Sequence, residues 1–323
     1  MTTLNNSNPT QLERRPSVHR TLIASRTVAD VLASVKPPRT RELVELPSTA
    51  TMEEAFDVLL AHDILSVPVY QQLDGNKKYL TIVSVLDLLK LLSGDAGERQ
   101  VLLKPLSDAI GLTQESSKLV TVRPADTLEY VMQLLSQHGS HRVLVQAEDQ
   151  SPVLLSQMDV ARYLQAHNHE LGKILDLTTP TIVEHARIRR GSPPTGDVAS
   201  ITYRMTAMEA FLKLAHSSLG ALAIETDDDE HLLVGEVSPE QLRGLNRERF
   251  DALHKPVVMY LKSRSGDELQ PPLTCHDRFT LSQIMTAFVL RKAHRLWWCD
   301  DEGHPKGVIT LTDLIGTFLD QVV

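Results

Sequence analysis

Hydrophobic and polar positions follow a unit that occurs four times along the chain. In each unit, an amphipathic run with apolar residues at helical spacing is followed by two short apolar, β-branched runs and then by a second amphipathic run. A Ser or Thr precedes each amphipathic run, and an acidic or amide residue usually follows it three positions later, which is typical of a capped helix N-terminus. The pattern therefore predicts helix, strand, strand, helix in every unit.

The spacing of the caps shows that the unit is an internal repeat. The second caps, at positions 84, 156, 238 and 310, are 72, 82 and 72 residues apart, and the first caps lie about 30 residues before them. The first caps are Thr51, Thr127, Thr206 and Thr280, and the second caps are Ser84, Ser156, Ser238 and Thr310. The equal outer spacings favour two pairs of repeats over four independent units. We predict an α+β protein with repeats over 23–92, 102–167, 172–247 and 254–323.

The segments outside this pattern are polar. Residues 1–22 lack hydrophobic periodicity and are predicted to form a disordered tail. Within the tail, Arg14 and Arg15 precede Ser17, which makes Ser17 a candidate phosphosite for a basophilic kinase, although a solvated tail without such a role fits the same residues. Thr27–Val35 is predicted to be a short helix entering the first repeat, and the loop Arg187–Gly196 explains the longer central spacing.

Composition narrows the class of protein. The 323 residues carry a net charge of −8, which gives no support for sequence-independent nucleic-acid binding, and no run of 18 apolar residues predicts a membrane span. Two cysteines fit a reducing compartment, cytoplasm or nucleus, and exclude a thiolate metal cluster within one chain. The acidic run at 227–230 and the His-rich run at 167–170 are interpreted as solvated segments, so no metal site is predicted.

Two of the repeats carry a more specific signature. The sequence Ser140-His-Arg-Val-Leu-Val145 in repeat 2 corresponds to Ala293-His-Arg-Leu-Trp-Trp298 in repeat 4, and repeat 4 ends in Gly307-Val-Ile-Thr-Leu-Thr-Asp313. These repeats resemble cystathionine-β-synthase (CBS) domains. The four-repeat layout resembles the γ regulatory subunits of AMP-activated and sucrose-non-fermenting protein kinases and their plant γ-like relatives. The resemblance implies that repeats pair into two Bateman modules, which stack as a pseudo-symmetric disc around nucleotide sites.

The residues of the repeats suit a nucleoside phosphate. Such a ligand needs an apolar slot for the base, an acceptor for the ribose hydroxyls, and cations or helix N-termini for the phosphate. The predicted site residues are Ser84, Asp87, His141, Arg142, Ser156, Asp159, His294, Arg295, Thr310 and Asp313. Each Ser/Thr-x-x-Asp taken alone also fits a simple helix cap, and each His-Arg also fits a surface pair; their common register across repeats favours the site.

The chain also departs from the family pattern. Repeat 3 has Gln241 where the family has Asp, so its site is expected to be altered or vacant. Leu65 in repeat 1 and Ser218 in repeat 3 stand where γ subunits place phosphate-binding arginines. Only half of the family's cations are present, and the number of occupied sites and the preferred nucleotide stay open.

The sequence contains no nucleophile–base pair, Walker loop or dinucleotide-binding glycine motif, so we predict that the protein is not an enzyme. The resemblance implies a regulatory subunit that binds AMP, ADP or ATP as regulatory ligands, without a covalent cofactor, and modulates a kinase complex of catalytic and scaffold subunits. The alternative is a four-repeat CBS scaffold that regulates a phosphatase, as some fungal relatives do, with weak or no nucleotide binding.

Overall fold

The computed structural model describes residues 17–37, 42–94, 98–137, 139–148, 151–191, 198–228, 230–266 and 268–320. It contains four sheets of three strands each, one in every predicted repeat. In each sheet the first strand pairs in parallel with the second, and the second pairs antiparallel with the third. The predicted α+β class is confirmed.

The strands follow the predicted order. Repeat 1 contains β1 (Leu46–Pro47), β2 (Ser66–Leu73) and β3 (Asn76–Ser84), and repeat 2 contains β4 (Thr121–Val122), β5 (Arg142–Val145) and β6 (Val153–Ser156). Repeat 3 contains β7 (Ser200–Thr202), β8 (Leu222–Glu225) and β9 (Leu233–Val237), and repeat 4 contains β10 (Thr274–Cys275), β11 (Arg295–Cys299) and β12 (Pro305–Thr310).

Each repeat also has an opening and a closing helix. The opening helices are α3 (Met52–Ala61), α6 (Leu128–Gln137), α9 (Ala207–Ala215) and α11 (Leu281–Arg291). The closing helices are α4 (Val85–Gly94), α7 (Gln157–Ala166) and α12 (Leu311–Thr317), whereas repeat 3 closes with the short 3-10 helix η6 (Pro239–Leu242). The predicted caps are confirmed: in repeat 4, for example, the Thr310 hydroxyl accepts from the Asp313 backbone N–H at 3.3 Å, and Asp313 accepts in return from the Thr310 N–H at 2.9 Å.

The segments that lead into the repeats pack on neighbouring repeats. Helices α1 (Val18–Ser25) and α2 (Val28–Val35) lie against repeat 2, where the Val28 N–H donates to the Asp126 carbonyl at 2.9 Å. The 3-10 helices η2 (Arg99–Leu103) and η3 (Leu106–Ala109) lie instead against repeat 1, where the Met52 N–H donates to the Lys104 carbonyl at 2.9 Å. The helix predicted over Thr27–Val35 is confirmed as α2 with Thr27 as its cap, but it packs on repeat 2 rather than on the first repeat, which follows it in the chain.

In the second pair of repeats, too, the segment that precedes each repeat packs on the other repeat of the pair, which we call an exchange of leading segments. Helix α8 (Thr179–Arg190) packs on repeat 4, with the Thr179 N–H donating to the Phe279 carbonyl at 2.9 Å. The 3-10 helix η7 (Phe250–His254) and α10 (Val257–Arg264) pack on repeat 3, with the Val257 N–H donating to the Met205 carbonyl at 2.8 Å. Repeats 1 and 2 thus form an intertwined first module, and repeats 3 and 4 a second module.

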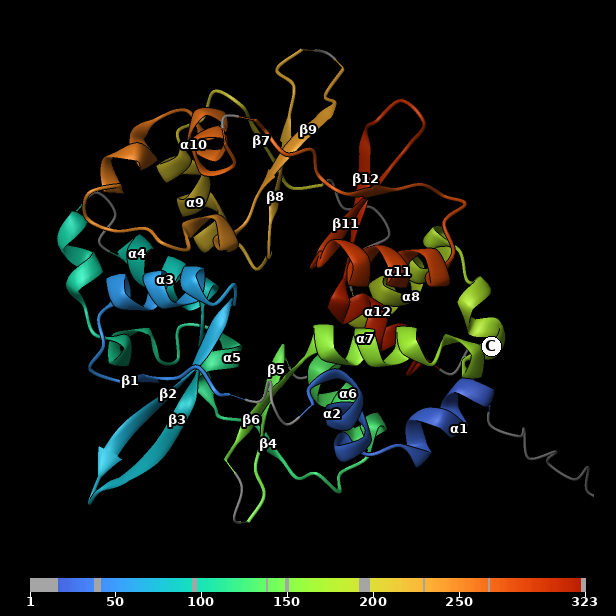
Figure 1. Cartoon of the computed structure of the whole chain (residues 1–323). Helices are drawn as coiled ribbons and strands as arrows, with labels where there is room; N and C mark the ends of the chain where they lie inside the picture. The colour runs from blue at the N-terminus through green and yellow to red at the C-terminus, as the bar shows by residue number, and fades with distance from the viewer. Residues whose placement is uncertain are drawn as a thin grey trace, which may run out of the picture.

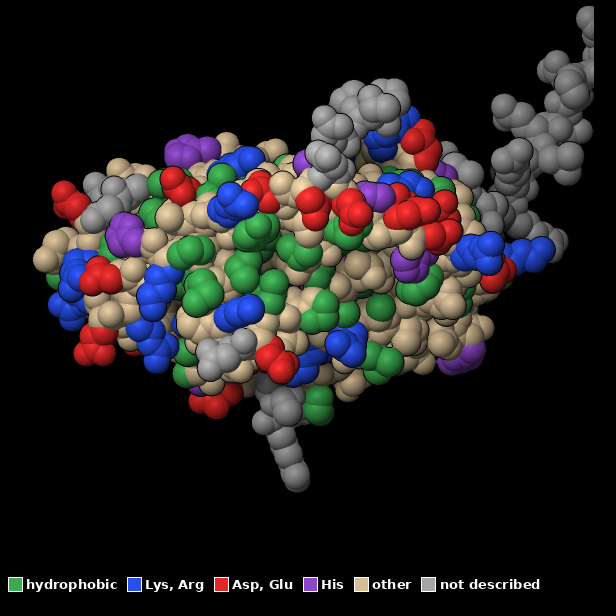
Figure 2. All heavy atoms as spheres, turned by 90° about the horizontal axis from the view of Figure 1, so that it is seen from above, with side chains coloured by type: hydrophobic (Ala, Val, Ile, Leu, Met, Phe, Trp, Pro, Cys, Tyr) green, Lys and Arg blue, Asp and Glu red, His purple; other side chains and the backbone are tan. Residues whose placement is uncertain are grey.

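The modules meet through their helices and form a flattened disc (Figure 1, Figure 2). One buried core joins the helices of repeats 1 and 3, and another joins those of repeats 2 and 4. A small cluster of Ala223, Trp297 and Cys299 joins the sheets of repeats 3 and 4. Trp297 is buried there, whereas the adjacent Trp298 is half-buried, as expected for neighbours on opposite faces of a strand.

Two sequence predictions about the connecting segments need correction. The predicted disordered tail extended to residue 22, but α1 begins at Val18, because Leu22 and Ile23 are buried against repeat 2. The predicted loop Arg187–Gly196 begins later, because α8 continues to Arg190 and ends at Gly191, with φ of 62°. Residues 1–16, including Arg14 and Arg15, and residues 192–197 lie outside the described residues.

The remaining short helices are α5 (Gln114–Ser117), η4 (Asn168–Glu170) and η5 (Gly172–Asp176). The inter-repeat segment, residues 98–120, joins α4 of repeat 1 to β4, the first strand of repeat 2, and so includes the start of the range predicted for repeat 2. Its helix α5 packs against β3. Among the described residues, every helix is too short or too polar to cross a bilayer.

Candidate nucleotide site at the centre of the disc

The fold brings the predicted His-Arg pairs next to the caps of the closing helices. Arg142 is the first residue of β5 and lies opposite Ser156, and the His141 carbonyl accepts from the Gln157 N–H at 3.0 Å. Arg295 lies in the same way opposite Thr310. Within repeats 2 and 4, the residues that were predicted to contact phosphate therefore lie beside those predicted to contact ribose.

Cations from three repeats converge near His294. Burial, followed by the charges of Arg142, Arg295, His141 and Arg243, lowers the pKa of His294 to about 3. We call His141, Arg142, Arg243, His294 and Arg295 the central cluster. Its arginines come from repeats 2, 3 and 4, which are separated along the chain. Strands β5 and β11, which begin with Arg142 and Arg295, lie near the middle of the disc (Figure 1). Arg243 was not among the predicted site residues, because no local motif marks it.

Carboxylates already contact the cations of the central cluster. Glu115 accepts from the His141 backbone N–H at 3.1 Å and lies 3.5 Å from the Arg142 guanidinium. Glu236 accepts from Arg295 at 2.9 Å and from the Trp297 indole N–H at 2.6 Å.

Two further carboxylates lie near arginines of the central cluster. Glu240 lies 4.0 Å from Arg295, and Asp63 of repeat 1 accepts from Arg243 at 2.9 Å. A phosphate group entering the central cluster would compete with these ion pairs for the same donors.

The three predicted ribose acceptors are buried in their own capping boxes. Asp87, Asp159 and Asp313 are 0%, 2% and 2% exposed. One carboxylate oxygen of each accepts from the N–H and hydroxyl of the preceding cap, at 2.8 and 2.6 Å in the case of Asp87. The cap role, which the sequence left open beside the ribose role, is thus present in each repeat that carries the acid.

A side chain from elsewhere in the chain also reaches each of these aspartates. Ser116 donates to Asp87 at 2.5 Å, Lys36 lies 2.9 Å from Asp159, and Arg190 pairs with Asp313. Ser116 and Lys36 belong to the segments exchanged within the first module, and Arg190 is at the end of α8, which is exchanged within the second. Burial raises the pKa of Asp87, partly offset by the hydrogen bonds from Ser116 and Ser84.

Repeats 1 and 3 differ at the corresponding positions. The Leu65 carbonyl accepts from the Val85 N–H at 2.9 Å, as the His141 carbonyl does from Gln157, so an apolar side chain takes the place of His141 in repeat 1. In repeat 3, Ser218 is exposed, and Arg295 of repeat 4 donates to the nearby Gly220 carbonyl at 3.3 Å. In repeat 3 the Ser238 N–H donates to the side-chain oxygen of Gln241 at 2.6 Å, as it would to an aspartate. The helix that follows is only the short 3-10 helix η6.

A cavity of about 240 Å³ lies between α2 and the hairpin β5–β6. It is lined mainly by apolar side chains, among them Ala29, Leu32, Val145 and Val153. Because Val145 pairs with Val153 at the opposite end of the hairpin from Arg142 and Ser156, the cavity does not adjoin the central cluster. None of the predicted site residues lines it.

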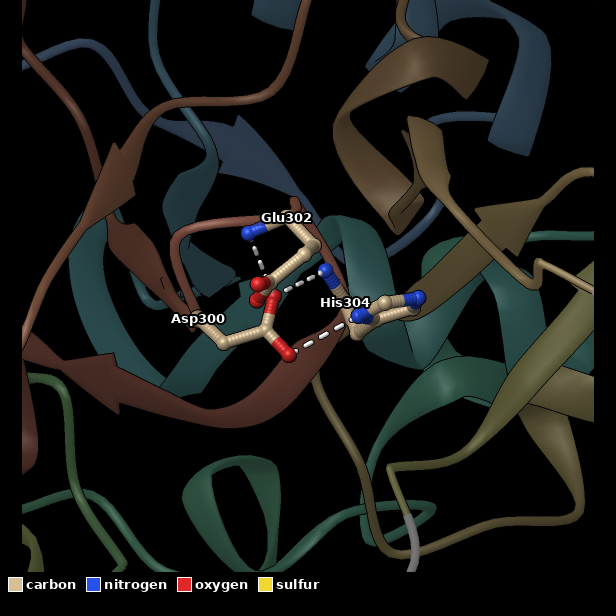
Figure 3. A group of neighbouring side chains, drawn as sticks. All are labelled: Asp300, Glu302 and His304. Atoms are coloured by element: carbon tan, nitrogen blue, oxygen red, sulfur yellow. Dashed lines mark hydrogen bonds and ion pairs between the residues drawn. The ribbon is translucent and has the colours of Figure 1, made fainter.

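Asp300, Glu302 and His304 form a group with potential metal ligands at the β11–β12 turn (Figure 3). Asp300 accepts from the backbone N–H groups of Glu302, Gly303 and His304 at 3.1, 2.8 and 2.8 Å, and from the His304 ring at 2.8 Å. These hydrogen bonds within the β11–β12 turn account for the closeness of the three side chains without a metal ion. In the view from above, acidic side chains gather over this part of the molecule, near the tips of the β8–β9 and β11–β12 hairpins (Figure 2).

Ser17, the predicted phosphosite, immediately precedes α1. Its hydroxyl lies 3.2 Å from the Nε2 atom of His19, and burial lowers the pKa of His19 to about 4. The two arginines that suggested kinase recognition lie outside the described residues, and phosphorylation of Ser17 stays a prediction.

Comparison with known proteins agrees with the fold. Residues 29–94 match the family model of the CBS domain. Over 336 residues, covering 85% of the chain and 90% of the relative, the chain is 25% identical to the SNF1-related protein kinase regulatory subunit gamma-like PV42b of Arabidopsis thaliana. It is 23% identical to Protein SDS23 of Candida glabrata, over 79% of the chain and 50% of that protein.

Solved structures share the architecture. A protein of Methanocaldococcus jannaschii, described as a candidate archaeal homologue of γ-AMPK, superposes with a TM-score of 0.64 at 16% identity, over 86% of this chain and 96% of that one. An uncharacterised conserved protein of Pyrococcus horikoshii gives a TM-score of 0.50 at 19% identity, with the same coverage. At these identities the likeness concerns the fold.

Residues 29–94 match the CBS domain model, and the four repeats share one arrangement of sheet and caps, in a fold like that of the archaeal protein. In sequence the chain is similar to the γ-like regulatory subunits of SNF1-related kinases, which confirms the predicted resemblance.

Proposed function

We propose that the protein is a non-catalytic regulatory subunit that binds an adenine nucleotide at the central cluster and thereby modulates a protein kinase complex. The observation that carries the proposal is that Arg142 and Arg295 lie opposite the caps Ser156 and Thr310 of the closing helices. The charges of both arginines, and of Arg243 from a third repeat, act on His294 and lower its pKa. Such a group of cations at the meeting point of both modules suits a ligand with several negative charges.

The arrangement also suggests how nucleotides would be distinguished. AMP, ADP and ATP differ in phosphate charge, so they would differ in how strongly they draw Arg142 and Arg295 away from Glu115 and Glu236. A ligand shifts a conformational equilibrium only if it binds two states with different affinity. Because the central cluster spans both modules, we infer that ligand charge biases the packing between them.

Similarity to γ-like subunits supports kinase catalytic and scaffold subunits as the partners. The regulatory ligand would be AMP, ADP or ATP, held without a covalent bond, and the place of action would be the cytoplasm or nucleus.

Isothermal titration of the purified chain with AMP, ADP and ATP tests the proposal. We expect micromolar binding that is lost in the double variant Arg142→Ala/Arg295→Ala. The matched control is Arg99→Ala, which removes an exposed arginine paired with Asp251 at 2.7 Å, away from the central cluster. Absence of heat with all three nucleotides, from protein shown to be folded, would refute nucleotide sensing.

The second candidate function is an interaction protein that regulates a phosphatase with little or no nucleotide binding. The neutralisation of Arg142 and Arg295 by carboxylates favours it, because these arginines are then less available to a nucleotide phosphate. Affinity capture with the tagged chain separates the two: recovery of kinase subunits supports the first function, and recovery of phosphatase subunits supports the second.

A further inference from the structure

Helix α5, in the segment between repeats 1 and 2, contacts a buried acid of repeat 1. The Ser116 hydroxyl is buried and donates to the Asp87 carboxylate at 2.5 Å. The Thr81 hydroxyl of β3 donates to the Ser116 carbonyl at 2.8 Å, which fixes the backbone of α5 against the sheet of repeat 1. Ser116 thus makes the kind of contact with Asp87 that a ribose hydroxyl would make.

The residue before Ser116 contacts repeat 2. Glu115 has a side chain only 5% exposed, and its carboxylate accepts from the His141 backbone N–H at 3.1 Å. The same carboxylate lies 3.3 Å from the His141 ring and 3.5 Å from the Arg142 guanidinium. A backbone N–H, an imidazole and a guanidinium are the donors that bind a phosphate group in proteins.

Two consecutive residues therefore reproduce both polar features of a nucleoside phosphate, a donating hydroxyl and an accepting anion. They reach Asp87 on one side and His141 and Arg142 on the other. We propose that Glu115 and Ser116 act as an internal occupant of the site between repeats 1 and 2, which a nucleotide must displace in order to bind there. This inference rests on the proposed nucleotide binding and adds to it a mechanism of self-inhibition.

The contacts of Glu115 and Ser116 hold α5 in one place, but the helix is short enough for a ligand to displace it. Helix α5 has only four residues, and a single helical turn is marginally stable without tertiary contacts. Burial would raise the pKa of Glu115, but the hydrogen bond from His141 and the charge of Arg142 lower it, so the carboxylate stays charged at neutral pH and opposes an incoming phosphate.

Charge removal at Glu115 tests the inference directly. We expect Glu115→Gln to bind AMP at least about tenfold more tightly than the unmodified chain, because one negative charge no longer competes for His141 and Arg142. The matched control is Glu98→Gln, which neutralises an exposed carboxylate in the same inter-repeat segment. Titration calorimetry gives affinity and stoichiometry for both variants.

Hydrogen–deuterium exchange on the unmodified chain gives a second readout that needs no substitution. Addition of AMP is expected to increase exchange at residues 111–117, because the ligand displaces α5. Equal AMP affinity in Glu115→Gln and Glu98→Gln, or increased protection of residues 111–117, would overturn the internal occupant while leaving nucleotide sensing intact. Absence of AMP binding to every variant, including Glu115→Gln, would overturn both.

Discussion

The two modules carry the same His-Arg pair but neutralise it with carboxylates from different kinds of structure. In the first module, Glu115 lies on a four-residue helix between repeats and faces His141 and Arg142. In the second, Glu236 lies within β9, opposite Ala223 of the sheet, and faces Arg295. The backbone around Glu115 can move without breaking a strand pairing, whereas the backbone of Glu236 is held by its pairing with Ala223. The comparison suggests a displaceable partner in one module and a fixed partner in the other.

The histidines of the two pairs differ in how far they are buried. The side chain of His141 is 47% exposed, whereas His294 is mostly buried, and burial together with neighbouring arginines lowers the pKa of His294 to about 3. At neutral pH, His294 is therefore an uncharged hydrogen-bonding group rather than a cation. Arg142, Arg243 and Arg295 carry the fixed positive charge of the central cluster.

The largest expected effect is the loss of Glu236. Glu236→Ala leaves the poorly exposed Arg295 and the Trp297 indole N–H without their acceptor, so we expect a loss of about 3 kcal/mol in unfolding free energy. Glu115→Ala should cost about half as much, roughly 1.5 kcal/mol, because its short helix can rearrange. Urea unfolding of both variants measures the difference, and equal losses would contradict the distinction between the modules.

A smaller effect is expected where α5 meets repeat 2. Gly139 has φ of 66°, and a Cβ atom there would lie 2.4 Å from the Gln114 side-chain oxygen. Gly139→Ala should therefore cost about 1–2 kcal/mol, from the left-handed backbone conformation and the displaced Gln114. Thermal unfolding measures it. Gly94→Ala, at the end of α4 with no atom near its new Cβ, is the control and should change stability little.

The titration of His294 gives an effect that depends on pH. Because its folded-state pKa is lowered to about 3 from 6.5, the unfolded chain binds a proton that the folded chain does not between these values. Because the unfolded chain takes up this proton, the free energy of unfolding decreases as the pH falls below about 6.5, by roughly 2 kcal/mol between pH 6.5 and 5.

Unfolding free energies at pH 7 and pH 5 test this contribution. His294→Gln should reduce the loss between these pH values, because the variant lacks the group that takes up the proton on unfolding. A loss that is unchanged in His294→Gln would show that other groups cause it.

The smallest expected effect sets the baseline for the ion pairs. Arg99 and Asp251 are 48% and 71% exposed at the side chain, so Arg99→Ala should change stability by less than about 0.5 kcal/mol. Urea unfolding beside Glu236→Ala makes the comparison. A loss similar to that of Glu236→Ala would mean that burial does not set the strength of these pairs.

The sequence by itself determined the features that depend on neighbours along the chain. A cap and its partner three residues later, such as Thr310 and Asp313, form within one helical turn, so the seven predicted capping boxes outside repeat 2's opening helix could be located from spacing alone. The same holds for the four hairpins and for the position of each His-Arg pair beside its cap, because strand pairing follows the repeat.

Only the tertiary structure decided which segments and charges meet. The exchange of leading helices within each module, the entry of Arg243 into the central cluster, and the pairing of Arg295 with Glu236, 59 residues away, leave no local pattern. Likewise, the contact of Glu115 with His141 spans 26 residues and depends on where the inter-repeat segment packs. Periodicity reports which face of an element is buried, but the partner of a buried charge is set by the packing of elements that are distant in sequence.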